Sequence, residues 1–95
     1  MRFSAAMLKG FEMVGGRQHF GDYCAGDPTR PVAVCAVGAA YLARHGNARK
    51  EDYLPDSLVY NVDAFRRLWG MDVAEANDLR LPWEHVYAMA RAAGI

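Results

Sequence analysis

Four histidine and cysteine side chains within residues 19–45 are of the types that bind zinc or attack electrophiles: His19, Cys24, Cys35 and His45. Structural zinc sites use close pairs of ligands, with about two to five residues between the members of a pair, whereas these four are spread over residues 19–45. We therefore expect no metal and no other cofactor. A thiol or metal-binding protein centred on Cys24 and His19 stays open as an alternative.

The two cysteines lie in different surroundings. Cys35 belongs to a run without charges, residues 31–43. It shares one helical face with Gly38 and Leu42, which predicts a buried thiol that packs as a small apolar side chain. Cys24 follows a stretch rich in glycine and aspartate, which predicts an exposed loop thiol of low reactivity because nearby carboxylates disfavour the thiolate. We expect both thiols to be reduced.

Apolar side chains at helical spacing predict the elements that must position these residues. The predicted helices cover residues 4–14, 31–45, 56–69 and 73–77, and a last helix begins at residue 82. The second helix should be buried on nearly all sides, because it is almost without charge. The expected fold class is all-α: a small bundle of four to five helices, with a long Gly-rich loop or a short β-hairpin between the first two. We expect one domain, residues 1–95.

The net charge and the amino-terminal segment limit which partners and which location we expect. Eleven basic and eleven acidic residues give a formal net charge of zero, so the chain carries no broad cationic field for nucleic acid or anionic lipid. The apolar run of the amino-terminal segment is interrupted by Lys9 and Glu12, which argues against a secretory signal. We expect a cytoplasmic protein without a membrane span.

The segment 15–30 is the first candidate for a binding surface, because long loops in compact domains are often functional. It and the last helix offer arginine and aromatic side chains, which are enriched in protein interfaces. Phe20 and Tyr23 could instead fold down as a lid over the core. The predicted partner-binding residues are Arg17, His19, Phe20, Tyr23, Arg30, Trp83, Tyr87 and Arg91.

The stretch "DVAEANDLRLPWEHVYAMARAAG" at residues 72–94 could also form a helix-turn-helix that binds DNA. Its second helix would present Glu84, His85 and Arg91 outward, which is a poor set for reading base edges. A plain helical hairpin is the favoured interpretation. Nucleic acid is therefore not the expected partner, and DNA binding stays a further alternative.

Three short motifs resemble a group of small uncharacterised proteins of bacteria and their phages. The motifs are "CAVGAAYLA" at residues 35–43, "ND" at 77–78 and "WEHVYAMARAAGI" at 83–95, which match a C-x-x-G-A helix followed by an N-D turn and a closing helix. The resemblance implies a small stand-alone protein of mobile-element type and no established activity. The matching residues also have packing or turn explanations: Cys35, Gly38, Ala39, Asn77 and Asp78.

We expect Asn77 and Asp78 to cap the last helix. The leading hypothesis for function is a non-enzymatic, helical protein-interaction module that binds and modulates a host protein. The partner is an unidentified protein, and a homodimer stays an open alternative.

Overall fold

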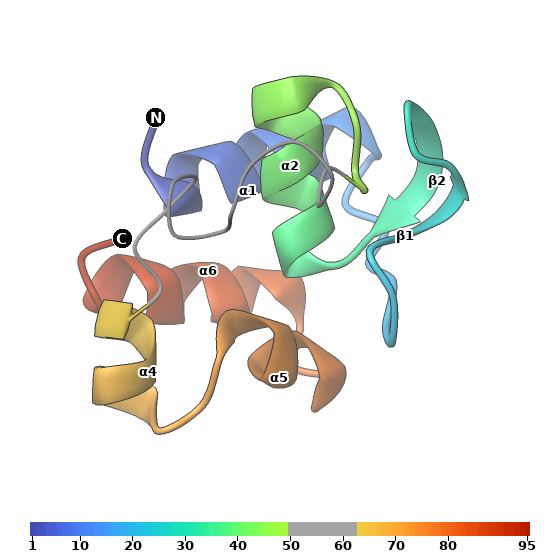
Figure 1. Cartoon of the computed structure of the whole chain (residues 1–95). Coiled ribbons are helices and arrows are strands. Elements are labelled where there is room, and N and C mark those ends of the chain that lie inside the picture. Colours follow the sequence, from blue (N-terminus) through green and yellow to red (C-terminus); the bar gives the residue numbers. More distant parts are fainter. Residues whose placement is uncertain (50–62) are drawn as a thin grey trace.

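The computed structural model describes residues 1–49 and 63–95, which form five helices and one two-stranded antiparallel hairpin (Figure 1). In chain order the elements are α1 (Phe3–Met13), β1 (Cys24–Asp27), β2 (Arg30–Val34), α2 (Ala36–His45), α4 (Asp63–Trp69), α5 (Val73–Asp78) and α6 (Trp83–Ala92). The expected all-α class is wrong, because strands β1 and β2 lie between the first two helices.

The hairpin occupies residues that the sequence assigned to the start of a helix. Strand β2 begins at Arg30, and α2 begins only at Ala36. Arg30 and Val32 are exposed while Pro31 and Ala33 are half-buried, which is the alternation of a strand, and Val34 at the end of β2 is fully buried. A short run without charges does not distinguish a buried helix from a strand, and the two β-branched valines favour the strand. Cys24 pairs with Val34 across the hairpin.

Local hydrogen bonds explain where the hairpin turns. The carboxylate of Asp27 accepts from the backbone N–H of Thr29 at 2.9 Å and from its hydroxyl at 2.8 Å, which closes the turn. The register shifts between Ala25 and Gly26, and Gly26 has a φ of 86° at this bulge. Pro31 is tolerated opposite Gly26 because this irregular pairing demands no N–H from it.

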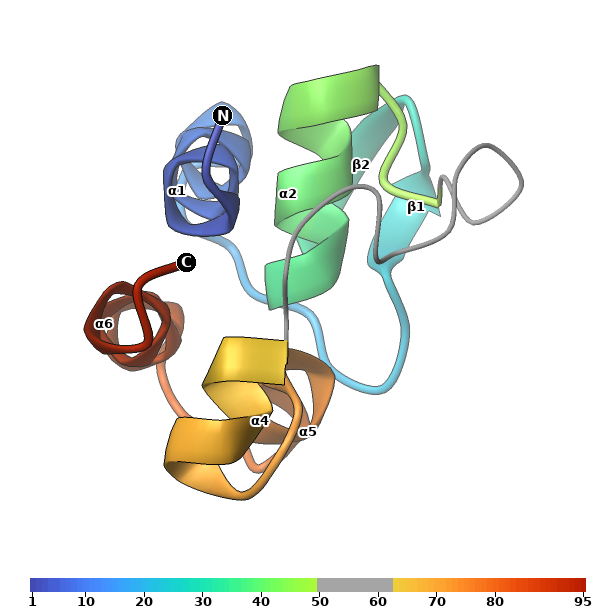
Figure 2. The same ribbon diagram turned by 60° about the vertical axis from the view of Figure 1, so that its left-hand side comes forward.

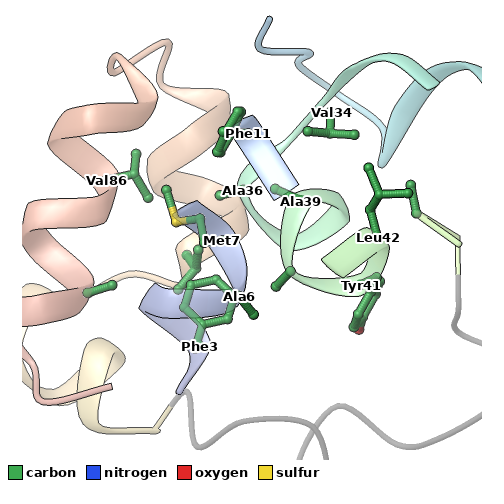
Figure 3. Close-up of a cluster of buried hydrophobic side chains, with 14 of the residues drawn as sticks. Phe3, Ala6, Met7, Phe11, Val34, Ala36, Ala39, Tyr41, Leu42 and Val86 are labelled. Carbon is green, nitrogen blue, oxygen red and sulfur yellow. The ribbon is translucent and has the colours of Figure 1, made fainter. Parts of the chain in front are cut away.

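Helices α1 and α2 cross at the centre of the core (Figure 3). Phe3, Met7 and Phe11 on α1 are fully buried, which confirms the face expected from their spacing. A Cβ atom on Gly10 would lie 1.9 Å from the carbonyl oxygen of Ala39, so the two backbones are in contact at this point. Only glycine permits this approach.

Helix α6 runs antiparallel to α1 on the side away from α2 (Figures 1 and 2). The ring of Trp83 stacks on the ring of Phe11, with centroids 4.7 Å apart. At the other end, the backbone N–H of Ser4 donates to the carbonyl of Ile95 at 3.1 Å. These two contacts fix the order in which side chains of α1 and α6 face each other.

Helices α4 and α5 pack against α6 and α2. Phe65 of α4 is fully buried, and the indole N–H of Trp69 donates to the carbonyl of Met89 at 3.0 Å. Helix α4 agrees with the end of the predicted helix 56–69, whose residues 56–62 lie outside the described residues. Among residues 1–49 and 63–95, the helices are too short to cross a bilayer, the longest being the 11 residues of α1.

Candidate functional site

A surface groove of about 630 Å³ runs between α1 and α6. We call it the α1–α6 groove, and it is lined by Arg2, Ser4, Ala5, Leu8, Lys9, Glu12, Tyr87 and Arg91. Two of these residues, Tyr87 and Arg91, were predicted from sequence as partner-binding. The groove residues from α1 recur at helical spacing on the face opposite Phe3, Met7 and Phe11. The helical periodicity that identifies the buried face of α1 therefore also defines this outer face.

The groove combines an apolar floor with an arginine whose side chain is oriented by contacts within the protein. Ala5, Leu8 and the ring of Tyr87 supply the apolar surface. The guanidinium of Arg91 donates to the Tyr87 hydroxyl at 3.1 Å and lies 5.9 Å from the centroid of that ring. Because both contacts come from the same helix, the arginine is oriented at the groove before any ligand arrives.

The groove has more basic than acidic side chains, and its one carboxylate lies toward one end. Arg2, Lys9 and Arg91 face a single carboxylate, that of Glu12. In the described part of the chain, Arg2, Lys9 and Glu12 form no ion pair. Because α1 and α6 are antiparallel, Arg2 and Arg91 lie at the same end of the groove and Glu12 lies toward the other.

The predicted loop surface at residues 15–30 is more ordered than expected. Its second half contains β1 and the hairpin turn. Residues 17–19 lie along β2, since the N–H of His19 donates to the carbonyl of Val34 at 2.8 Å and the N–H of Val34 donates to the carbonyl of Arg17 at 3.1 Å. The side chain of Arg17 donates to the carbonyl of Val32 at 2.6 Å. This arginine therefore connects the loop to the hairpin.

The aromatic residues predicted to bind a partner have intramolecular contacts. The half-buried ring of Tyr23 packs against Tyr41 with centroids 5.8 Å apart, and Trp83 stacks on Phe11. The guanidinium of Arg80 lies 4.8 Å from the centroid of the Phe20 ring. For Tyr23 and Trp83, packing against the core is the role that the contacts support. Arg30 is exposed at the end of the hairpin turn.

Asn77 is the residue that sequence reasoning missed most clearly. It is fully buried, and its Oδ1 accepts from the N–H of Ala36 at 3.0 Å and from Nε2 of Gln18 at 2.9 Å. Its Nδ2 donates to the carbonyl of His19 at 3.0 Å. The expectation that Asn77 and Asp78 cap the last helix is wrong, because they end α5 and hold the loop and the start of α2 instead.

A second cavity, of about 260 Å³, lies at the amino end of α2, beside Cys35 and the carboxylates of Asp22 and Asp78. Asp78 accepts from the backbone N–H of Gly21 at 3.0 Å. Asp22 forms an ion pair with Arg49 at 2.5 Å, and hydrogen bonding from this guanidinium lowers the pKa of the Asp22 carboxyl. Both carboxylates therefore already have partners within the chain.

The two thiols are buried. Cys35 precedes α2, and its Sγ accepts from the N–H of Gly38 at 3.2 Å as the helix cap. Burial raises the pKa of the Cys35 thiol to about 11. The predicted burial of Cys35 is confirmed, although it caps the helix rather than lying within it. The predicted exposure of Cys24 in a loop is wrong: the residue lies in β1 with 3% of its surface exposed, and burial raises the pKa of its thiol.

We expect neither Cys24 nor Cys35 to react with N-ethylmaleimide at pH 8 while the protein is folded. Both thiols are buried and their pKa values are raised, so little thiolate is available to the reagent. In urea both should react completely, as mass spectrometry would show. Rapid labelling of Cys24 in the folded protein would contradict the prediction.

The raised thiol pKa values also predict how stability depends on pH. Between pH 9 and 11 the folded state retains thiol protons that the unfolded state loses, so the free energy of unfolding should fall as pH rises from about 9 toward 11.

Within residues 1–49 and 63–95, no three His, Cys, Asp or Glu side chains gather closely enough to hold a metal ion. No protein-family model, curated protein or solved structure matched the chain. The assignment of function therefore rests on the geometry of the groove and the chemistry of its side chains.

Proposed function

We propose that this protein is a small, non-enzymatic protein-interaction module that binds its partner in the α1–α6 groove. The observation that carries the proposal is the combination of an apolar floor with Tyr87 and Arg91, in one groove, on the outer face of two packed helices. Tyrosine and arginine are the residue types that dominate binding energy in protein interfaces. Grooves between helices commonly accept a segment of another protein.

Two further parts of the proposal rest on the sequence. The resemblance to small proteins of bacteria and phages points to a bacterial host protein as the partner, whose activity binding would modulate. The free thiols of Cys24 and Cys35 fit the cytoplasm, where thiols stay reduced. The alternative of a thiol or metal-binding protein centred on Cys24 and His19 has less support, because Cys24 is buried and its pKa is raised.

A substitution that fills the groove tests this function. Ala5 is exposed in the groove, so Ala5→Trp adds an indole there without a change of charge. Tagged wild-type protein should retain a partner from a bacterial lysate, and Ala5→Trp should lower its recovery by about tenfold or more, as quantitative mass spectrometry would measure. The matched control is Ala92→Trp, which places the same side chain on an exposed position of α6 outside the groove.

The competing loop surface is tested in the same experiment. Arg17→Ala combined with Arg30→Ala removes two exposed arginines that lie outside the groove. Loss of the partner in this double variant, with full recovery in Ala5→Trp, would transfer the interface to the loop and hairpin. Recovery of no partner by the wild-type protein, together with measurable turnover of a substrate, would overturn the proposal in favour of an enzyme.

A further inference from the structure

We infer that the occupant of the α1–α6 groove is an acidic amphipathic helix of the partner, with its carboxylates concentrated at the Arg2–Arg91 end. This inference rests on the proposed function and adds the chemistry of the partner. The argument combines the length of the groove, the size of the side chains on its floor and the order of its charges.

The dimensions of the groove suit a short helix. Its lining on α1 extends from Arg2 to Glu12, which corresponds to about 15 Å along a helix axis. A partner helix of about ten residues, or three turns, has the same length. Ala5 is a small residue on the floor and lets a third backbone approach closely, while Leu8 and Tyr87 offer apolar surface to its buried face.

The charges select an acidic helix. Arg2 and Arg91 lie at one end of the groove, Lys9 lies between, and Glu12 lies toward the other end. Arg2 and Lys9 have no ion-pair partner among the described residues, so a ligand carboxylate would gain attraction without breaking an existing pair. Glu12 would repel a further carboxylate, so the acidic residues should cluster at the Arg2–Arg91 end.

A nucleic acid fits the groove less well. A phosphate backbone would gain nothing from the apolar floor and would meet the carboxylate of Glu12. The whole chain has a formal net charge of zero, so it offers a polyanion no net attraction beyond the groove itself. Duplex DNA is therefore the competing ligand in the test.

The probes are three synthetic helical peptides of about 14 residues with the same leucine face. Their polar faces carry glutamate, glutamine or lysine. The glutamate peptide should bind the wild-type protein at least about fivefold more tightly than the glutamine peptide, as fluorescence anisotropy would measure at low salt. The difference should shrink as the salt concentration rises, because mobile ions screen exposed charges. Amide NMR shifts should map to α1 and α6.

Charge-reversal variants test the individual groove positions. Lys9→Glu should weaken binding of the glutamate peptide about fivefold, and Glu12→Lys should strengthen it by a similar factor. The control is Arg67→Glu, which makes the corresponding change on an exposed position of α4 outside the groove and should leave the affinity unchanged. All three positions are exposed, so folding should be preserved, and circular dichroism would verify this.

Several outcomes would overturn the inference. Equal binding of all three peptides in the groove would remove the charge argument while leaving the proposed function in place. Shifts confined to the loop and hairpin, tighter binding of a 16-base-pair duplex, or self-association that blocks the groove would each assign the surface to another ligand. If no peptide binds but Ala5→Trp still abolishes capture of the cellular partner, the acidic-helix inference fails and the interaction function stands.

Discussion

Replacement of Asn77 by leucine should destabilise the protein by about 3–5 kcal/mol, although the two side chains have the same branched shape and the same number of heavy atoms. The Asn77 side chain is fully buried and bonds to two other segments of the fold, the loop at Gln18 and His19 and the start of α2 at Ala36. Leucine would leave the buried N–H of Ala36 and the carbonyl of His19 without these partners, and each unsatisfied group costs about 1–3 kcal/mol. Urea unfolding followed by circular dichroism would measure the change.

The control for this substitution is the neighbouring residue. Asp78→Asn retains an oxygen that can accept from the N–H of Gly21, and its position is exposed, so the free energy of unfolding should change by no more than about 0.5–1 kcal/mol. Gln18→Ala should fall between the two, because it removes one of the contacts of Asn77. If Asn77→Leu were as stable as the wild type, the hydrogen bonds of Asn77 would not be what holds the loop to α2 and α5.

Gly10→Ala should destabilise the protein by about 3 kcal/mol or more, against the intrinsic preference of a helix. In an isolated helix, alanine is favoured over glycine by about 1 kcal/mol. Here the added Cβ would lie 1.9 Å from the carbonyl oxygen of Ala39, so the two central helices would have to separate. The neighbouring core residues Met7 and Phe11 would then lose part of their packing. Thermal and urea unfolding would both register the loss.

Glu12→Ala is the matched control on the same helix. Glu12 is exposed on the groove face, so its replacement should change the free energy of unfolding by less than about 0.5 kcal/mol. A higher melting temperature for Gly10→Ala, as helix propensity alone would predict, would show that α1 and α2 do not approach as closely as described.

Parts of the fold could be predicted because they depend on neighbouring residues in the chain. The spacing of Phe3, Met7 and Phe11 identified the buried face of α1, and the helices that end near Trp69 and begin near Val73 followed from similar patterns. The start of α2 could not be located in this way. The run from Pro31 to Val34 is apolar in either structure, and its pairing with Cys24 and neighbouring residues decided in favour of a strand.

The candidate site, too, could be predicted from the sequence only in part. Tyr87 and Arg91 were predicted as partner-binding from their residue types, but their neighbours Arg2 and Lys9 were not. Those basic residues are 89 and 82 positions from Arg91 in the chain, and their meeting with Arg91 depends on the antiparallel packing of α6 on α1. The same holds for Asn77, whose sequence context suggests a turn and whose partners lie on other elements.

By itself, the sequence determined the helical periodicity of α1, the burial of Cys35 and the neutral charge balance, because these properties follow from residue type and local spacing. Only the tertiary structure decided that Cys24 is buried in a strand, that Gly10 touches Ala39 and that α1 and α6 form a groove. The physical reason is that burial, close approach and the ordering of charges depend on which distant segments pack together. Local preferences restrict that packing but do not specify it.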